Sequence, residues 1–398
     1  MLLLFWISLA ILFFCYIGYG MVLLLWNTLK RELFAGRGKE VGGEKPPVTL
    51  IVTAYNEQLV LEEKIRNTLS LKYPKELLTI IFVTDGSSDD SPELIRHYPD
   101  ILLLHQPERM GKPAAIKRAM ELVQTPVVVF SDANTMLNAE SIDRLMSHYT
   151  DPKVGGVAGE KKIFSSQHVS AVGEAEGLYW QYESFLKMLD AGFNTVVGAA
   201  GELFSIRTHL FSELGDDVIL DDLVISVNVC MQGYKIGYEP NAYATELPSY
   251  SLADEEKRKV RIAAGAYQSI GLLKGCLNFT SHPLLSFQYL WRRIVRWMIC
   301  PPALMVLLIT NIFIVYREGH HQLYTVFLYG QVLFYLLALA GGLLIRSGKR
   351  AGLLSIPFYF VFMNYCLVRG FFKYFTGGQS VLWEKSLRQT DVLSLRDR

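Results

Sequence analysis

The sequence predicts an α/β domain built on a mostly parallel sheet and set between transmembrane helices. Two observations predict this arrangement. Strand-like and helix-like segments alternate between residues 46 and 150, and long apolar stretches without charge lie on either side of the domain. The chain has 398 residues, of which 51% are hydrophobic and 19% are charged, so we expect both a membrane part and a charged globular part.

The apolar stretches predict where the chain crosses a membrane. No Asp, Glu, Lys or Arg occurs in residues 1–29, 297–316, 322–345 and 351–368. Each stretch approaches or exceeds the roughly 18–20 apolar residues that cross a hydrocarbon core. We therefore expect an N-terminal transmembrane helix over 1–29, about three C-terminal transmembrane helices over 297–376, and a tail over 377–398. A cleaved signal peptide is disfavoured, because no basic residue precedes the first stretch.

The charges beside these spans predict the orientation of the protein. The first span is followed by the basic residues Lys30, Arg31, Arg37, Lys39 and Lys45. By the positive-inside rule, the N-terminus lies outside and the α/β domain in the cytoplasm. We thus expect a multi-pass protein of the cytoplasmic, or inner, cell membrane. The basic loop at 346–350 then also faces the cytoplasm, which fits one span before the domain and two after it.

The C-terminal tail conflicts with this count. After a further complete span the tail would lie outside, yet the last part of the chain is rich in basic residues: Arg369, Lys373, Lys385, Arg388, Arg396 and Arg398. Two explanations stay open. Either the apolar run at 351–376 does not fully cross the bilayer, or a segment near 277–296 enters it.

Composition limits the class of partner. A net charge of +1 gives no case for binding nucleic acid. The five cysteines are scattered without metal-like or disulfide-like spacing, which suits a reducing compartment. The basic cluster of Arg292, Arg293 and Arg296 favours an interfacial anchor at the start of a span over a specific site for a lipid headgroup.

The first half of the domain shows repeated strand–helix units. Apolar, β-branched runs predict four strands: 47–57, 77–90, 100–106 and 125–134. Helices are predicted at 56–71 and 111–124, and another begins at Ser91-Pro92, with proline in its first turn. Such alternation indicates βαβ units and hence a parallel sheet.

After residue 150 the alternation loosens. We expect a strand at 155–164, a long helix at 168–190, a small-residue segment leading to a strand at 196–207, a helix within 216–233 and a helix at 252–275. Residues 251–296 as a whole are expected to form amphipathic or interfacial helices. The aromatic residues Tyr179, Trp180, Tyr182 and Phe185 of the long helix favour a place in the core over a sugar-stacking platform.

Polar residues follow three of the predicted parallel strands. They are Tyr55-Asn56-Glu57, Asp85-Gly86-Ser87 and Asp132-Ala133-Asn134. The carboxyl ends of parallel strands share one edge of the sheet, where ligands bind in such folds. Between them the basic loop 109–112 enters a helix N-terminus, where anions are favoured. The sequence therefore predicts a binding site at this edge.

Six motifs in this region occur in the order of a known family. They are TAYNE at 53–57, TDGSSDD at 84–90, GKPAAIKRAM at 111–120, SDAN at 131–134, GAAGELFSIR at 198–207 and LDDLVIS at 220–226. On these motifs, spread over residues 47–265, the chain resembles the membrane-embedded glycosyltransferases of family 2. That group includes cellulose, chitin, hyaluronan and poly-N-acetylglucosamine synthases. The resemblance implies a Rossmann-like GT-A fold over residues 46–250, with a nucleotide-binding half at 46–135 and an acceptor half at 136–250.

The resemblance also implies roles for individual residues. Tyr55 and Glu57 match the first nucleotide-contacting loop, and Asp85 matches the carboxylate that reads the base. Asp132 and Asn134 match the element that holds metal and ribose, and Asp222 matches the catalytic base. The family's Gln-x-x-Arg-Trp signature is altered here, because Arg258 and Ile262 replace its Gln and Trp while Arg261 keeps the cation. The change puts processivity in question.

The chemistry of sugar transfer agrees with these assignments. A departing nucleoside diphosphate develops negative charge, which Mg²⁺ or Mn²⁺ and the cations Lys112 and Arg261 could neutralise. Asp132 and Asn134 alternate along an extended strand end and thus project to one side, as two oxygen ligands would. An amide is a weak ligand, so the diphosphate should hold most of the metal. The acceptor hydroxyl needs a base, and Asp221 would raise the proton affinity of Asp222, although both would also suit a helix N-terminus.

The sequence therefore predicts an inverting, metal-dependent membrane glycosyltransferase. It would move a sugar from a UDP-sugar to a growing polysaccharide or a lipid-linked acceptor, in contact with membrane lipids and with room for accessory export subunits. Two alternatives stay open. One is transfer of a single sugar to a lipid, and the other is a nucleotide-sugar-binding subunit without turnover.

Overall fold

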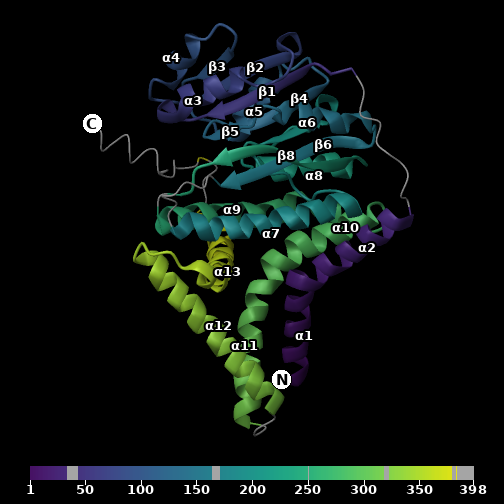
Figure 1. Ribbon diagram of the computed structural model, residues 1–398, viewed down its shortest axis with the longest axis vertical. Helices are drawn as coiled ribbons and strands as arrows, with labels where there is room; N and C mark the ends of the chain where they lie inside the picture. Colours follow the sequence, from purple (N-terminus) through teal and green to yellow (C-terminus); the bar gives the residue numbers. More distant parts are fainter. Residues whose placement is uncertain (34–43, 164–170, 250, 318–321, 379–381, 383–398) are drawn as a thin grey trace.

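The computed structural model describes residues 1–33, 44–163, 171–249, 251–317, 322–378 and 382. Figure 1 shows three layers along the long axis: an α/β domain at one end, the helices α7 (Ala171–Phe193) and α9 (Leu252–Leu272) beneath its sheet, and apolar helices at the other end. The tail predicted at 377–398 lies mostly outside the described residues.

The sheet contains the strands β1 (Val48–Ala54), β2 (Leu78–Asp85), β3 (Leu102–Gln106), β4 (Val127–Asp132), β5 (Thr135–Leu137), β6 (Val154–Ile163), β7 (Phe204–Arg207) and β8 (Lys235–Glu246). Their order is β3-β2-β1-β4-β7-β6-β8-β5. β1 pairs in parallel with β2 and β4, and β2 pairs in parallel with β3. The parallel half that the sequence predicts is thus confirmed.

The second half of the sheet has mixed directions. β7 runs antiparallel to both β4 and β6, whereas β8 is parallel to β6 and antiparallel to β5. These pairings join strands that are far apart in sequence, so no alternation of strands and helices along the chain predicts them. The sheet as a whole is therefore a mixed sheet with a parallel N-terminal half.

Helices cover both faces of the sheet. One face carries α3 (Gln58–Leu69), α4 (Ser91–Arg96) and α6 (Ser141–Met146), and the other carries α5 (Lys112–Met120) and α8 (Asp221–Met231). Successive residues of β1 point to opposite faces of the sheet. Leu50 belongs to the apolar cluster beneath α3, and Ile51 belongs to the cluster beneath α5. All of β1 is buried, which explains its continuous apolar sequence.

Short helical turns occur in the α/β domain, after it and between the apolar helices. They are η2 (Lys75–Leu77), η3 (Ser147–Thr150), η4 (Thr208–Leu210), η5 (Lys274–Leu277) and η7 (Gly352–Leu354).

The apolar part consists of α1 (Leu2–Phe13), η1 (Phe14–Gly18), α2 (Tyr19–Leu33), α10 (Pro283–Tyr289), η6 (Leu290–Ile299), α11 (Cys300–Arg317), α12 (Gln322–Arg346) and α13 (Ser355–Phe375). Within the described residues, four helical segments are long and apolar enough to cross a membrane: Leu2–Glu32, Pro283–Arg317, Gln322–Arg346 and Gly352–Phe375. The chain is a membrane protein. In Figure 1, α1, α11 and α12 descend away from the sheet, whereas α13 is seen nearly end-on beneath α7 and α9.

The arginine cluster at the start of the second candidate span contacts α7. Arg292 is buried and pairs with Asp190 at 2.8 Å and with Glu183 at 3.3 Å. Arg296 pairs with Glu183 at 2.6 Å. The prediction of an interfacial anchor is therefore wrong for Arg292, because η6 joins the apolar helices to the α/β domain through buried ion pairs.

Candidate active site

One cavity of about 1150 Å³ lies between the carboxyl ends of the central strands and the helices α7, α9 and α13. Among the residues that line it are Tyr55, Glu57, Lys112, Asp132, Asn134, Asp222 and Arg261. The strand-end site predicted from sequence thus coincides with a real cavity. Of the predicted site residues, Asp85 is not among those that line it.

The centre of the site is an ion pair between Asp132 and Lys112. Asp132 ends β4, and Lys112 opens α5 directly after Gly111, whose φ of +96° few other residues adopt. The Lys112 Nζ lies 2.7 Å from Asp132 Oδ1 and 3.4 Å from Asp221 Oδ2. Although burial opposes its charge, the carboxylates of Asp132, Asp221 and Asp222 raise the pKa of Lys112.

Asp221 and Asp222 form the first turn of α8. Burial, together with the adjacent Asp221 carboxylate, raises the pKa of Asp222 to about 7. Such a carboxyl can exchange a proton near neutral pH. The backbone N–H of Leu223 donates to Asp222 Oδ1 at 2.8 Å, which leaves Oδ2 to face the cavity. Arg261 of α9 faces the same pair of carboxylates, although burial lowers its pKa.

Gly201 lies where these groups meet. A Cβ atom built on Gly201 would be 3.2 Å from Lys112 Nζ, 3.5 Å from Asp222 Oδ2 and 3.7 Å from Asp132 Oδ2. Residues from four separate parts of the chain therefore surround one point. Asp132 and Asp222 thus lie near one point of the cavity, whereas Asp85, the third carboxylate expected there, does not line it.

In this structure Asp85 accepts hydrogen bonds from the neighbouring loop. Its buried carboxylate accepts from the backbone N–H groups of Met110 and Gly111, the latter at 2.6 Å, and lies 3.3 Å from Arg118. Lys112 follows this loop directly. Asp85 thus fixes the segment that leads to Lys112 in the cavity.

The residues that the resemblance links to the nucleotide lie in the loop after β1. The Arg109 guanidinium lies 3.6 Å from the centre of the Tyr55 ring, which makes a cation–π contact above the strand ends. The backbone N–H of Asn56 donates to Ser87 Oγ at 3.1 Å and thereby ties this loop to the one after β2. The two strand-end loops form one rim.

A buried lysine donates hydrogen bonds to residues at and just after the end of β4. Lys64 of α3 donates to Ser131 Oγ at 2.8 Å and to the Thr135 carbonyl at 2.7 Å. Burial lowers the pKa of Lys64 to about 7. It lies at an ordinary helix position, so no sequence motif pointed to it.

The acidic side chains fit a divalent cation. Three carboxylates, those of Asp132, Asp221 and Asp222, lie around the ammonium of Lys112, so their oxygens could also serve a divalent cation. Asn134 donates through its amide N–H to Glu246 at 3.4 Å, and its carbonyl oxygen is the ligand that a metal would use. Within the described residues, no group of three His, Cys, Asp or Glu side chains is arranged to hold a metal by itself.

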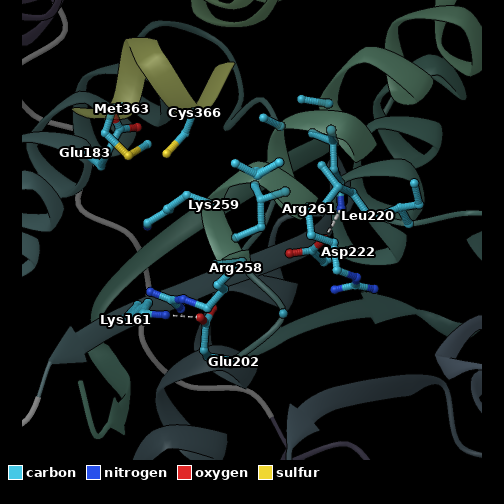
Figure 2. A pocket seen from close by; sticks show the side chains of 18 of the residues that line it. Lys161, Glu183, Glu202, Leu220, Asp222, Arg258, Lys259, Arg261, Met363 and Cys366 are labelled. Carbon is cyan, nitrogen blue, oxygen red and sulfur yellow. Dashed lines mark hydrogen bonds and ion pairs between the residues drawn. The ribbon is translucent and has the colours of Figure 1, made fainter. Parts of the chain in front are cut away.

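The cavity continues past these groups toward the apolar helices. Figure 2 shows Asp222 and Arg261 in one region, Lys161, Glu202 and Arg258 in a second, and Met363 and Cys366 beside Glu183 in a third. Lys161 pairs with Glu202 and Glu246, and Arg258 pairs with Glu176 and lies 3.0 Å from Glu255. Sequence analysis missed Lys161 and Glu202, although Glu202 adjoins the quoted glycine motif.

The aromatic residues of α7 take their predicted place in the core only in part, since Tyr179 and Tyr182 alone pack against buried apolar clusters. Tyr179, Trp180 and Tyr182 line the cavity, while Phe185 is exposed. The Trp180 ring centre lies 5.0 Å from Lys161 Nζ and 5.4 Å from Lys187 Nζ. Periodicity could not separate a core stripe from a cavity wall, because both need one apolar helix face.

Comparison with known proteins agrees with this geometry. Residues 49–215 match the family model described as Glycosyl transferase family 2. Poly-β-1,6-N-acetyl-D-glucosamine synthase of Staphylococcus aureus strain COL is 28% identical over 233 residues, which cover 56% of this chain and 55% of that protein. The Staphylococcus epidermidis protein of the same name is 25% identical over 235 residues, with the same coverage. The match thus spans about half the length of these relatives.

A solved structure matches nearly the whole chain. It is a mannosyltransferase from Pyrobaculum calidifontis in complex with GDP-Man and Mn²⁺, with a TM-score of 0.68 and 20% identity, covering 94% of this chain and 100% of that one. At this identity the likeness concerns the fold alone. The predicted GT-A fold with attached apolar helices is confirmed.

Proposed function

We propose that this chain, whose residues 49–215 match the model described as Glycosyl transferase family 2, transfers a sugar from a UDP-sugar to a membrane-associated acceptor. The observation that supports this most directly is the meeting of Lys112, Asp132 and Asp222 around Gly201 at one end of a large cavity. Cations that face a leaving diphosphate and a carboxyl that titrates near neutral pH are what such a transfer requires.

The roles follow from the positions. Asp132 and Asn134 would hold Mg²⁺ or Mn²⁺, which supplies positive charge to the diphosphate when bound. Lys112 would then exchange its contact with Asp132 for a phosphate oxygen, and Arg261 would add a second cation. Tyr55, Glu57 and, through the loop that it fixes, Asp85 would form the nucleotide side of the site.

Asp222 would remove the proton from the acceptor hydroxyl as that oxygen attacks the anomeric carbon. The sugar–phosphate bond breaks in the same displacement, so the sugar inverts its configuration. A carboxyl with a pKa near 7 is well matched to this task at neutral pH, because it is ionised often enough to accept a proton and basic enough to hold it.

Transfer to a lipid-linked acceptor is favoured over extension of a free polymer by the position of Ile262. This residue lines the cavity at the place where the family signature has Trp. The cavity also reaches the apolar helices through Phe360, Met363 and Leu367 of α13. The products decide between the two: a ladder of oligomers would support polymer synthesis, and one glycolipid would support single transfer.

The orientation forms part of the proposal. We place the α/β domain in the cytoplasm and α13 along the cytoplasmic surface, in line with its position beneath α7 and α9 in Figure 1. Arg369 of α13 pairs with Glu256 of α9, and Tyr359 donates to Glu255 at 3.0 Å, so α13 is tied to the cavity-forming helix. With α13 outside the bilayer core, the basic tail falls on the cytoplasmic side and the charge rule is satisfied.

A donor screen tests the proposal. Purified protein is incubated with single UDP-sugars, Mn²⁺ or Mg²⁺ and membrane lipids, and UDP release is measured, followed by mass analysis of lipid extracts and polymer. Metal-dependent release with one donor and a glycosylated product is the expected result. Tight UDP-sugar binding without release across a panel of acceptors would favour a non-catalytic subunit instead.

A further inference from the structure

Two cations that line the cavity have no carboxylate partner among the described residues: Lys187, which is buried, and Arg293, which is half-buried. Lys187 of α7 is 5% exposed, lines the cavity, and its Nζ atom has no hydrogen-bond partner within the described part of the chain. Arg293 of η6 also lines the cavity, and its Nε donates to the Val197 carbonyl at 2.9 Å. No described carboxylate forms an ion pair with either residue.

Their neighbours show how the protein treats other buried cations. Lys161 pairs with two carboxylates, Arg258 with three, and Arg292 with two. Although burial opposes its charge, Glu202 and Glu246 raise the pKa of Lys161. Burial lowers the pKa of Lys187, and the carboxylates near it offset only part of that effect. A buried cation without a counter-charge is costly unless a ligand supplies one.

The wall of the cavity is apolar on the side of α13. Ile356, Phe360, Met363 and Leu367 of α13 line the same cavity, as does Tyr16 of η1. Ile356 is also 53% exposed, so this wall continues to the outer surface of α13. A ligand that carries both an anion and a hydrocarbon chain matches the two kinds of wall.

We propose that Lys187 and Arg293 bind the phosphate of a lipid acceptor whose hydrocarbon chain lies against α13. This assignment rests on the proposed function, because it names the acceptor of the same reaction. Contacts lead from Gly201 through Glu202 and Lys161 to Trp180 and Lys187, so a sugar attached to such a lipid would lie beside Trp180 on its way to Asp222. Aromatic faces of this kind suit a sugar ring.

The test compares probes that differ in one property. Dodecyl phosphate, dodecanol and inorganic phosphate are titrated onto the full-length protein in nanodiscs of zwitterionic lipid, and binding is followed by thermophoresis. Dodecyl phosphate should bind at least about tenfold more tightly than either other probe, since charge-assisted hydrogen bonds and apolar contact act together. Equal binding of dodecanol would overturn the anion site, and equal binding of inorganic phosphate would overturn the lipid.

Substitutions of Lys187 test whether this residue binds the phosphate. Lys187→Met should weaken dodecyl phosphate binding roughly tenfold or more, while Lys187→Arg should retain most of it. Lys162→Met is the matched control, because Lys162 is exposed and packs on Tyr243 outside the cavity. The Lys187→Met protein should melt at or above the parent temperature, since it loses an uncompensated buried charge. Undiminished binding by folded Lys187→Met would refute the assignment.

Two further measurements distinguish an acceptor site from a site for ordinary headgroups, and failure of the phosphate site from failure of the proposed function. Adding phosphatidylglycerol to the nanodiscs should leave dodecyl phosphate binding nearly unchanged, and complete displacement would show a site for ordinary headgroups instead of an acceptor. UDP binding with Mn²⁺ is measured on the same samples. A parent protein that binds UDP but not dodecyl phosphate would disprove the phosphate site alone, whereas a protein that binds neither would also contradict the proposed function.

Discussion

The ionisation of Asp222 determines the pH dependence expected of the proposed sugar transfer. Burial and Asp221 raise its pKa to about 7, so the carboxylate that would accept the proton is lost progressively as the pH falls below that value. We expect kcat to fall about tenfold per pH unit on the acid side of pH 7. The Asp221→Asn variant lacks the like charge that raises the pKa of Asp222. The acid limb of its pH–rate profile should therefore move to lower pH. A pH–rate profile measured for both proteins checks this, and an unmoved limb would argue against coupling between the two carboxylates.

Gly201 makes room for the reacting groups. A methyl group at this position would come within 3.2 Å of Lys112 Nζ, the flexible end of a side chain that can yield, so Gly201→Ala should fold with little loss of stability. It would occupy space between Asp132 and Asp222, however, and displace the donor. We expect kcat/KM to fall by about tenfold to a hundredfold with an unchanged melting temperature. Normal activity in Gly201→Ala would show that the donor lies elsewhere.

The predictable site residues were those that a strand end or a motif presents. Asp132, Lys112 and Asp222 could be identified because each follows a recognisable strand or opens a helix. Lys187 and Lys161 could not, since each lies within an ordinary helix or strand. Their importance arises only from burial in a shared cavity, a property of the tertiary structure.

At the scale of the element, the turn after β2 depends on Gly86. Its φ is +66°, and a Cβ atom there would lie 2.5 Å from Arg109 Cβ. Gly86→Ala should therefore destabilise the loop by about 1–3 kcal/mol and lower the melting temperature by several degrees. Nucleotide binding should weaken as well, because the clash falls on Arg109, whose loop leads to Lys112.

Gly177→Ala is the matched control for that experiment. Gly177 lies within α7, and a Cβ atom there would meet nothing within 4 Å. Because glycine is a poor helix former, this substitution should leave the free energy of unfolding unchanged or raise it by up to about 1 kcal/mol. The melting temperature should therefore stay the same or rise. Thermal melting of both variants compares a strained turn with an ordinary helix position. Equal shifts would show that the Gly86 turn relaxes without cost.

The elements differed in how well the sequence predicted them. The parallel half of the sheet was predictable, because strands and helices alternate and each βαβ unit is local. The pairing of β7 with β4 and β6 was not, since it depends on register between distant segments. The arginines of η6 look like a membrane anchor in sequence, and only the position of Glu183 and Asp190 on α7 shows that Arg292 and Arg296 bind carboxylates.

At the scale of the whole molecule, α13 determines the side on which the chain ends. It lies against α9 and across the direction of α11 in Figure 1, so we expect the C-terminus on the same side as the α/β domain. A green fluorescent protein fused after Arg398 should fluoresce in cells, and an alkaline phosphatase fused at the same place should be inactive. The opposite pair of results would mean that α13 crosses the bilayer.

The proposal that one cavity performs sugar transfer is tested most directly by UDP release from Asp222→Asn. Asparagine keeps the size of the side chain but cannot accept the proton, so release in the presence of donor, acceptor lipid and metal should fall by about a hundredfold or more. Asp216→Asn is the control, because Asp216 is exposed and does not line the cavity. It should match the parent. If folded Asp222→Asn released UDP as fast as the parent, Asp222 would not be the base and the reaction would have to be sought in another part of the protein.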